Sequence, residues 1–319
     1  MFIGSSALAG VRTVTQSSPT PVSISRRTFA RGLVASLMLR SVDLTAQRGP
    51  AERPLRQIDH VMIKADDPRE VLAFFTETLG LPMAWQVEER GGVVSGGVGF
   101  GNVNVEAIRF PGQTSLPSGA QLTGFGFEPS SMRACLDELQ RRGVSHGPPR
   151  PLISTDTNGA KHTLFTNVTL LGLSDSALPV DATMHIFVSE YDSAYVDVAR
   201  RRARLSEALT ASRGGPLGVE SMSEIVVGTS DVDTMRPRWQ RLLDPTRPTR
   251  AGAWQVGTGP AIRIVPAKEN RVEELVVRVR SLARAKAFLH THGLLAREPA
   301  AEVILDPSKV FGIRLRLVQ

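Results

Sequence analysis

The stretch from Ile58 to Phe110 constrains the fold of this chain more than any other. It begins with an apolar strand pattern that contains His60, continues with a helical pattern from Glu70 to Leu81, and ends with two alternating apolar runs. Alternation with a period of two indicates a strand with one buried face, whereas apolar residues three and four apart indicate a helix. The stretch therefore predicts a strand, a helix and a three-stranded meander, with His60 on the first strand and Glu106 on the last.

Three motifs in this stretch resemble the vicinal oxygen chelate superfamily, the group of glyoxalase I, bleomycin-resistance proteins and extradiol dioxygenases. They are His60-Val61-Met62-Ile63-Lys64-Ala65-Asp66-Asp67-Pro68, Val71-Leu72-Ala73-Phe74-Phe75 and Leu79-Gly80-Leu81-Pro82. The resemblance implies paired βαβββ modules with metal ligands on the first and last strands, where His60 and Glu106 fall. Imidazole and carboxylate groups both suit divalent first-row metal ions.

The first 46 residues resemble an export signal. Arg26 and Arg27 precede Phe29 and the apolar stretch 32–39, which is far too short to span a bilayer. Twin arginines before a short apolar region are typical of a Tat signal peptide. We therefore expect a periplasmic or extracellular protein without a stable membrane span; the alternative is a disordered basic leader.

The charge of the chain gives no sign of nucleic acid binding. Its net charge of +7 falls to +3 when the five arginines and one aspartate of the leader are removed. The remaining sequence has no basic run interleaved with aromatic residues, the pattern that follows a nucleic acid backbone. The single cysteine, Cys135, excludes a disulfide within one chain and is expected to be a buried thiol.

The strand and helix pattern recurs three times, beginning near Leu122, Met222 and Glu273. The sequence thus predicts an α+β fold of four βαβββ modules that pair into two glyoxalase-like domains. We place the first domain at residues 50–192, a linker at 193–218 and the second domain at 219–319. Without the leader, the chain has about 270 residues, which is enough for two domains of ordinary size.

The second module departs from the pattern that the resemblance implies. Gly124 falls where His60 stands in the first module, and Phe187 falls where a ligand glutamate is implied. His185 precedes Phe187 by two residues, so both side chains share one face of the strand. His185 is therefore the candidate third metal ligand; the alternative is a hydrogen-bonded packing residue.

Four residues are candidates for contact with a substrate. Trp85, Phe100 and Phe187 would line an apolar pocket for a ring, the kind of surface that small-molecule sites favour. Asn104 shares its strand face with Glu106 and would orient a substrate oxygen. The alternative for the aromatic residues is an ordinary place in the core.

The second domain substitutes charged pairs at the same positions. Glu224 and Glu274 fall where His60 stands, while Arg263 and Arg316 fall where Glu106 stands. Guanidinium and carboxylate groups match in geometry and form bidentate pairs. The sequence therefore predicts an ionic cluster in place of a metal, with a carboxylate-binding site at either arginine as the alternative.

The resemblance implies a metal-dependent lyase, isomerase or dioxygenase that acts on a small oxygenated organic compound, as a monomer or homodimer. His60, Glu106 and His185 would hold a divalent ion, with Fe, Mn, Zn and Ni all open, and Glu106 would be catalytic. An extradiol dioxygenase is disfavoured, because in that resemblance the second domain supplies two histidines and a glutamate.

Two other functions stay open: a metal-free small-molecule-binding protein of the same fold, and a structural module. The metal-dependent enzyme and the metal-free binding protein differ in the surroundings that they predict for His60. The enzyme predicts an open polar cup around His60 and Glu106, whereas the binding protein predicts an apolar cup in which His60 bonds directly to Glu106.

Overall fold

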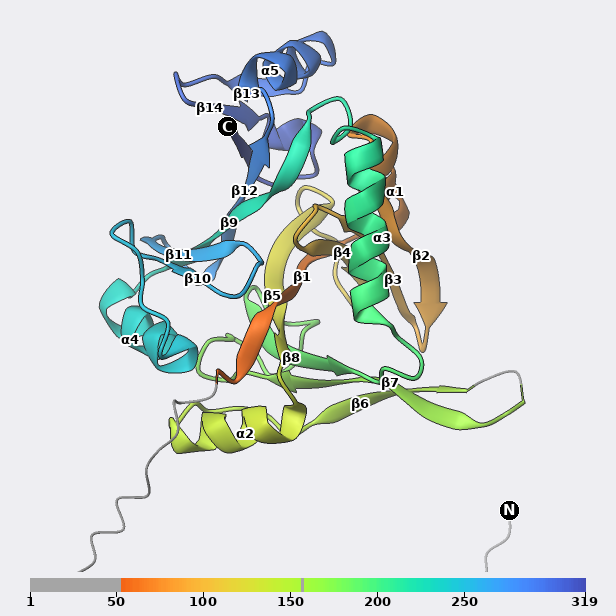
Figure 1. Cartoon of the computed structure of the whole chain (residues 1–319), viewed down its shortest axis with the longest axis vertical. Helices are drawn as coiled ribbons and strands as arrows, with labels where there is room; N and C mark the ends of the chain where they lie inside the picture. The colour runs from red at the N-terminus through yellow and green to blue at the C-terminus, as the bar shows by residue number, and fades with distance from the viewer. Residues whose placement is uncertain (1–52, 156–157) are drawn as a thin grey trace, which may run out of the picture. The chain divides into compact units, whose positions relative to one another are not determined.

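Two mixed sheets, of eight and seven strands, organise the protein in the computed structural model (Figure 1). The structure describes residues 53–155 and 158–319, so the export signal predicted for residues 1–46 lies outside the described residues. The described residues belong to one compact unit. The α+β class and the paired βαβββ modules predicted from the sequence are confirmed.

The first sheet joins two modules through their first strands, in the order β2-β3-β4-β1-β5-β8-β7-β6. Strands β1 and β5 are antiparallel, whereas β1 pairs with β4 and β5 pairs with β8 in parallel. The strands are β1 (Leu55–Ala65), β2 (Met83–Arg90), β3 (Val93–Gly99), β4 (Asn104–Arg109), β5 (Ala120–Pro129), β6 (Arg150–Thr155), β7 (Lys161–Thr169) and β8 (His185–Tyr191).

The second sheet repeats this arrangement in the order β10-β11-β9-β12-β15-β14-β13. Its strands are β9 (Val219–Thr229), β10 (Ala253–Gln255), β11 (Ala261–Pro266), β12 (Arg271–Val279), β13 (Leu295–Arg297), β14 (Glu302–Leu305) and β15 (Leu315–Val318). Within the described residues, the third module has two strands after its helix, one fewer than the βαβββ pattern predicts.

Each α-helix begins at an aspartate or serine whose side chain accepts a hydrogen bond from a free backbone N–H of the first turn. Gly143 and Gly293 follow the second and fifth helices with φ of 64° and 65°, a conformation that glycine adopts without strain. The helices are α1 (Pro68–Ala73), continued by a π-helical turn (Phe74–Thr78), α2 (Met132–Arg141), α3 (Val198–Ala211), α4 (Val232–Leu243), α5 (Leu282–Thr291) and a 3-10 turn (Pro307–Lys309).

The two sheets share one hydrophobic core. Strand β5 contacts β12, and the ring of Phe125 on β5 stacks on Trp239 of α4 with centroids 5.8 Å apart. Helix α3 packs alongside β2 and β3 of the first sheet through the buried Leu205 (Figure 1). Leu205 lies against Gly99 on β3, so α3 covers part of the face of the first sheet that carries Trp85 and Glu106.

Candidate functional site

A cavity of about 440 Å³ lies against the inner face of the first sheet, and side chains from both modules and from α3 line it. Volumes of 300–1,000 Å³ are typical of small-molecule sites. Most of the wall is apolar or aromatic, and its polar side chains are those of His60, Glu88, Arg90, Ser95, Glu106, Asn167, His185, Ser189, Tyr191 and Arg201.

His60 lies on β1 between Asn104 of β4 and Gly126 of β5. Its Nδ1 atom is 2.7 Å from Asp59 Oδ2, and its Nε2 atom is 3.3 Å from Glu106 Oε2. Burial lowers the pKa of His60, but the bonds to the two carboxylates outweigh it and raise the pKa to about 9. His60 is therefore an imidazolium at neutral pH, held between two carboxylates.

Asp59, which the sequence analysis did not single out, is the centre of this network. It is 1% exposed and accepts hydrogen bonds from Tyr191 Oη at 2.7 Å and Arg202 Nη2 at 3.2 Å, besides its bond with His60. Burial raises the pKa of Asp59, but its partners overcome this effect and lower the pKa to about 2. Asp59 thus stays charged and holds His60 protonated.

Tyr191 supplies a neutral donor to the same network. Burial and the nearby Asp59 carboxylate raise the pKa of its phenol well above 10. The phenol therefore remains protonated and donates to Asp59. The sequence signal for Tyr191 is its place at the end of β8, at an even spacing from His185 and Phe187 that puts it on their face of the strand.

His185 has the opposite character, although it lines the same cavity. It is 5% exposed, and its Nδ1 atom has no hydrogen-bond partner among the described residues. Burial lowers the pKa of His185 to about 4, so the ring is neutral at physiological pH. It pairs in register with Gly124, whereas His60 pairs with Gly126, so the two histidines occupy different rows of the sheet.

Phe187 lies between the two histidines. Its ring centroid is 5.3 Å from that of His60 and 5.2 Å from that of His185. A side-chain carbon added at Gly126 would come within 2.7 Å of the Phe187 ring, so the glycine makes room for this ring. The register confirms the sequence alignment in which Phe187 occupies the strand position that Glu106 has in the first module.

The described residues do not fit a three-ligand metal site. His60 and Glu106 are in contact, but Phe187 holds the strand position where the resemblance implies a third ligand, and Asp59 bonds the other nitrogen of His60. No group of three histidine, cysteine, aspartate or glutamate side chains in residues 53–155 and 158–319 is arranged to hold a metal. A structural or catalytic metal ordinarily has at least three protein ligands.

The remaining predicted substrate contacts divide into two groups. Trp85 lines the cavity, as does Phe187. Phe100 is 1% exposed and packs in the core against Phe75, while Asn104 is buried beside the His60 backbone; neither lines the cavity.

The side chain of Asn102 exchanges two hydrogen bonds with the Met222 backbone of the second sheet.

The charged cluster predicted for the second sheet is confirmed. Arg263 Nε is 2.8 Å from Glu224, and Arg316 Nε is 2.8 Å from Glu274. Arg316 also binds Glu302 at 2.9 Å and lies 3.8 Å from Glu224. Both arginines have carboxylate partners within the protein, so this cluster closes the second sheet where the first sheet has its cavity.

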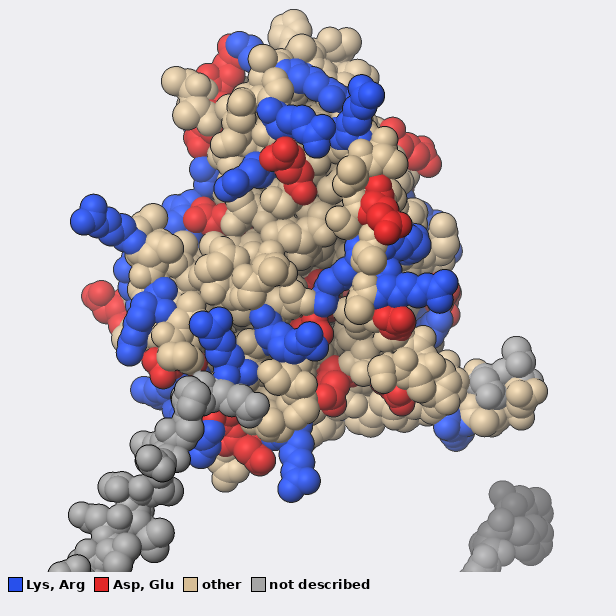
Figure 2. Space-filling model, viewed as in Figure 1, with Lys and Arg blue, Asp and Glu red and all other residues tan. Residues whose placement is uncertain are grey.

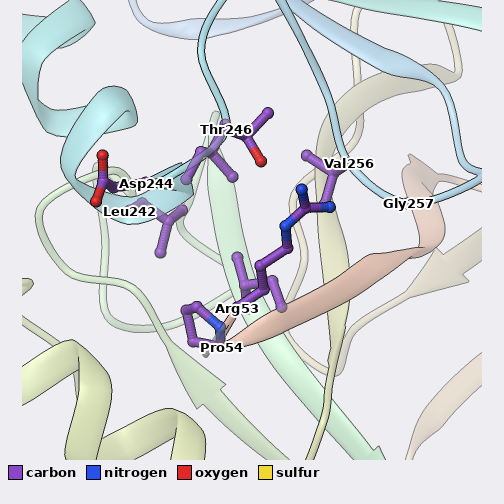
Figure 3. A pocket seen from close by; sticks show the side chains of 9 residues that line it. Arg53, Pro54, Leu242, Asp244, Thr246, Val256 and Gly257 are labelled. Atoms are coloured by element: carbon purple, nitrogen blue, oxygen red, sulfur yellow. The ribbon is translucent and has the colours of Figure 1, made fainter. Parts of the chain in front are cut away.

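A second, much smaller hollow lies where the start of β1 meets the segment after α4 (Figure 3). Arg53 and Pro54 face Leu242, Thr246 and Val256 there. Its volume of about 10 Å³ is room for roughly one water molecule. It is therefore too small to bind an organic ligand.

Figure 2 shows arginine and lysine side chains interspersed with acidic ones on the visible face, rather than gathered into one basic stripe. None of the helices in the described part of the chain combines the length and apolarity needed to cross a membrane.

Comparisons with known proteins agree with this architecture. Residues 57–167 match the family model described as Glyoxalase/Bleomycin resistance protein/Dioxygenase superfamily. The matched range contains all of the first module, with His60 and Glu106, and most of the second. It supports the superfamily that the sequence motifs indicate. The comparison with curated protein sequences gave no match.

Solved structures of dioxygenases are similar in fold. A variant of homoprotocatechuate 2,3-dioxygenase from B. fuscum has a TM-score of 0.53 at 12% identity over 85% of this chain and 74% of that chain. The native homoprotocatechuate 2,3-dioxygenase from Arthrobacter globiformis has a TM-score of 0.52 at 14% identity over 85% and 81%. At these identities the similarity concerns the fold alone.

Proposed function

We propose that the cavity of the first sheet binds a small organic molecule without a metal ion. The observation that carries this proposal is that three buried polar side chains of the cavity wall have atoms with no hydrogen-bond partner among the described residues. These atoms are Asn167 Oδ1, His185 Nδ1, and Nε and Nη2 of Arg201. Buried polar atoms are nearly always hydrogen-bonded, so the convergence of these atoms on one cavity supports a ligand that carries polar groups.

The state of His60 supports the metal-free form of this proposal. Its Nε2 atom contacts Glu106 directly, and the wall around them is largely apolar, which are the two features predicted for a binding protein. A metal ion would have to compete with a proton on a histidine whose pKa is about 9. His60 and Glu106 therefore form the polar end of an otherwise apolar cavity.

A neutral fluorescent reporter tests the cavity. We expect 1-aminoanthracene, a flat apolar amine, to bind the wild-type protein with a blue-shifted emission, because the cavity is large enough and apolar. Ser189→Trp should abolish this signal, since Ser189 is 1% exposed and lines the cavity. Ser206→Trp, at an exposed position of α3, is the matched control. Equal binding to both variants, or none to the wild type, would refute the proposal.

The second candidate is the metal-dependent lyase, isomerase or dioxygenase that the sequence resemblance implies. One observation favours it: the Nε2 atom of His60 and the carboxylate of Glu106 converge to 3.3 Å at the cavity wall. Elemental analysis of protein purified without a histidine tag distinguishes the two, with His60→Ala and Glu106→Ala as comparisons. We expect no stoichiometric metal; near-stoichiometric Fe, Mn, Zn or Ni that disappears in both variants would favour the metalloenzyme.

A further inference from the structure

Arg201 is held rigidly at the wall of the cavity. It belongs to the first turn of α3, and its side chain is 15% exposed. The guanidinium carbon lies 5.3 Å from the ring centroid of Trp85 and 5.2 Å from that of Tyr191, so the two rings flank it. Stacking on aromatic rings leaves the edge of a guanidinium free to donate hydrogen bonds.

Within the described residues, the charged partner of that edge is the Asp59 carboxylate. Nε and Nη2 of Arg201 are buried and have no hydrogen-bond partner among the described residues. The Oδ1 atom of Asp59 is 3.6 Å from Nη2, which is too long for a hydrogen bond. Nε and Nη2 form the side of the guanidinium that binds two oxygens of one carboxylate in parallel.

The neighbouring arginines of α3 differ from Arg201 in this respect. Arg202 donates to Asp59 and pairs with Glu128, and Arg204 donates to the backbone carbonyl of Ala84. Asp59 already accepts from His60, Tyr191 and Arg202, so it does not require Arg201 as a further donor. Arg201 therefore lines the cavity with Nε and Nη2 atoms that make no hydrogen bond within the described residues.

We propose that Arg201 anchors a carboxylate of the cavity's ligand, and that this ligand is an organic acid with an aromatic or otherwise apolar body. This inference rests on the proposed function, because it assumes that the cavity is a binding site. Phe187, Phe165 and Leu164 would contact the apolar body. Glu106 lines the same wall and Asp59 lies 3.6 Å from Arg201, and their negative charges favour a singly charged acid over a phosphate.

Displacement of bound 1-aminoanthracene by phenylacetate and by phenylacetamide tests the inference. The two competitors share size and shape and differ in charge at physiological pH. Hydrogen bonds to a charged group contribute about 1.5–3 kcal/mol, so we expect phenylacetate to bind the wild type at least about 10-fold more tightly than the amide. Arg201→Gln should remove this preference, and Arg201→Lys should retain part of it, since lysine keeps the charge without the fork.

Arg200→Gln is the control, because it makes the same charge change at the adjacent, exposed position of α3. The preference for phenylacetate should persist in this variant. The preference is the ratio of two affinities measured on the same protein. A misfolded variant would bind neither competitor nor the reporter, so misfolding is distinguished from loss of the preference. Equal affinities in the wild type, or a preference unchanged by Arg201→Gln, would overturn the carboxylate anchor while leaving the binding function intact. Failure of the reporter itself to bind would overturn both.

Discussion

At the scale of single residues, the environment of each histidine on the cavity wall decides its charge. His60 and His185 are both nearly fully buried, so desolvation disfavours the charged form of each. His60 has Asp59 and Glu106 in contact, whereas His185 stacks on Phe187 and its Nδ1 atom has no hydrogen-bond partner in the described part of the chain. The same residue type is thus a cation in one row of the sheet and neutral in the next.

His60 makes the stability of the protein fall as the pH rises. Its folded pKa of about 9 exceeds the ordinary histidine pKa of 6.5, so the folded state holds a proton between these pH values that the unfolded state has lost. The contribution is complete below pH 6.5, is lost through pH 9, and amounts to no more than roughly 3 kcal/mol. Urea unfolding between pH 6 and 10 should show this decrease, and His60→Gln should flatten it. An unchanged slope in that variant would contradict the assignment.

His185 makes the stability of the protein fall as the pH is lowered below 6.5. Its folded pKa of about 4 is below 6.5, so the unfolded state binds the extra proton between these values. Stability should therefore be complete above pH 6.5 and fall as the pH is lowered through 4. We expect His185→Gln to flatten this acid limb and to leave the alkaline limb unchanged. His290→Gln, on α5 and away from the cavity, is the control and should alter neither limb.

At the scale of elements, the sequence predicted the strands and helices that repeat, but not the partners that come from elsewhere. The module pattern placed His60, Glu106, Phe187 and the charged pairs of the second sheet correctly in register, because strand alternation transmits position along a sheet. Arg201 was missed because it comes from α3, which follows no strand register. Its contacts depend on how α3 packs, which no local pattern encodes.

Phe187 is the side chain that separates this site from a three-ligand metal site, so its replacement should create one. The 5.3 Å between the ring centroids of Phe187 and His60 suits two imidazoles bound to one ion. We expect Phe187→His to bind Ni²⁺ or Zn²⁺ with a Kd on the order of 1 µM or below, measured by equilibrium dialysis. Phe165→His, elsewhere on the cavity wall, is the control. Binding that survives the addition of His60→Ala would contradict this geometry.

The ion pairs of the second sheet should differ in their effect on stability. Arg316 pairs with three glutamates, whereas Arg263 pairs with Glu224 alone. Removing Arg316 leaves three partly buried carboxylates close together, so we expect Arg316→Gln to lower the free energy of unfolding by about 2 kcal/mol. Arg263→Gln, at a 28% exposed side chain, should cost less than about 1 kcal/mol. Equal losses in chemical denaturation would contradict this order.

At the scale of the whole molecule, the export signal and the oligomeric state, which the sequence leaves as monomer or homodimer, stay predictions. The twin arginines permit a direct test of export. We expect the double change Arg26→Lys and Arg27→Lys to retain the full-length chain in the cytoplasm of a Tat-competent bacterium, whereas the unchanged chain is processed near residue 46 and exported. Cell fractionation and the mass of the mature chain measure both. Export of the variant at the wild-type level would contradict a Tat signal.

The two sheets are joined by contacts that make independent unfolding of the halves unfavourable. Asn102, in the loop before β4, exchanges hydrogen bonds with the Met222 backbone on β9, and Arg142 after α2 donates to the carbonyl of Leu242 on α4. Trp239 is fully buried against Phe125 of the first sheet. The division into domains at 50–192 and 219–319 stays a prediction, but these contacts cross it.

We therefore expect one cooperative thermal transition for the mature chain, with equal calorimetric and van't Hoff enthalpies. Trp239→Ala should lower the free energy of unfolding by about 3–5 kcal/mol, because it removes a large buried side chain of α4 that packs against Phe125 and Phe127 of the first sheet. A ligand bound only in the cavity of the first sheet should raise the temperature of the whole transition, since binding to the folded state stabilises every element that unfolds with it. The contrary result would be two separate thermal transitions, of which 1-aminoanthracene raises only one. The two halves would then unfold as independent domains, and the contacts through Trp239 and Asn102 would not couple them.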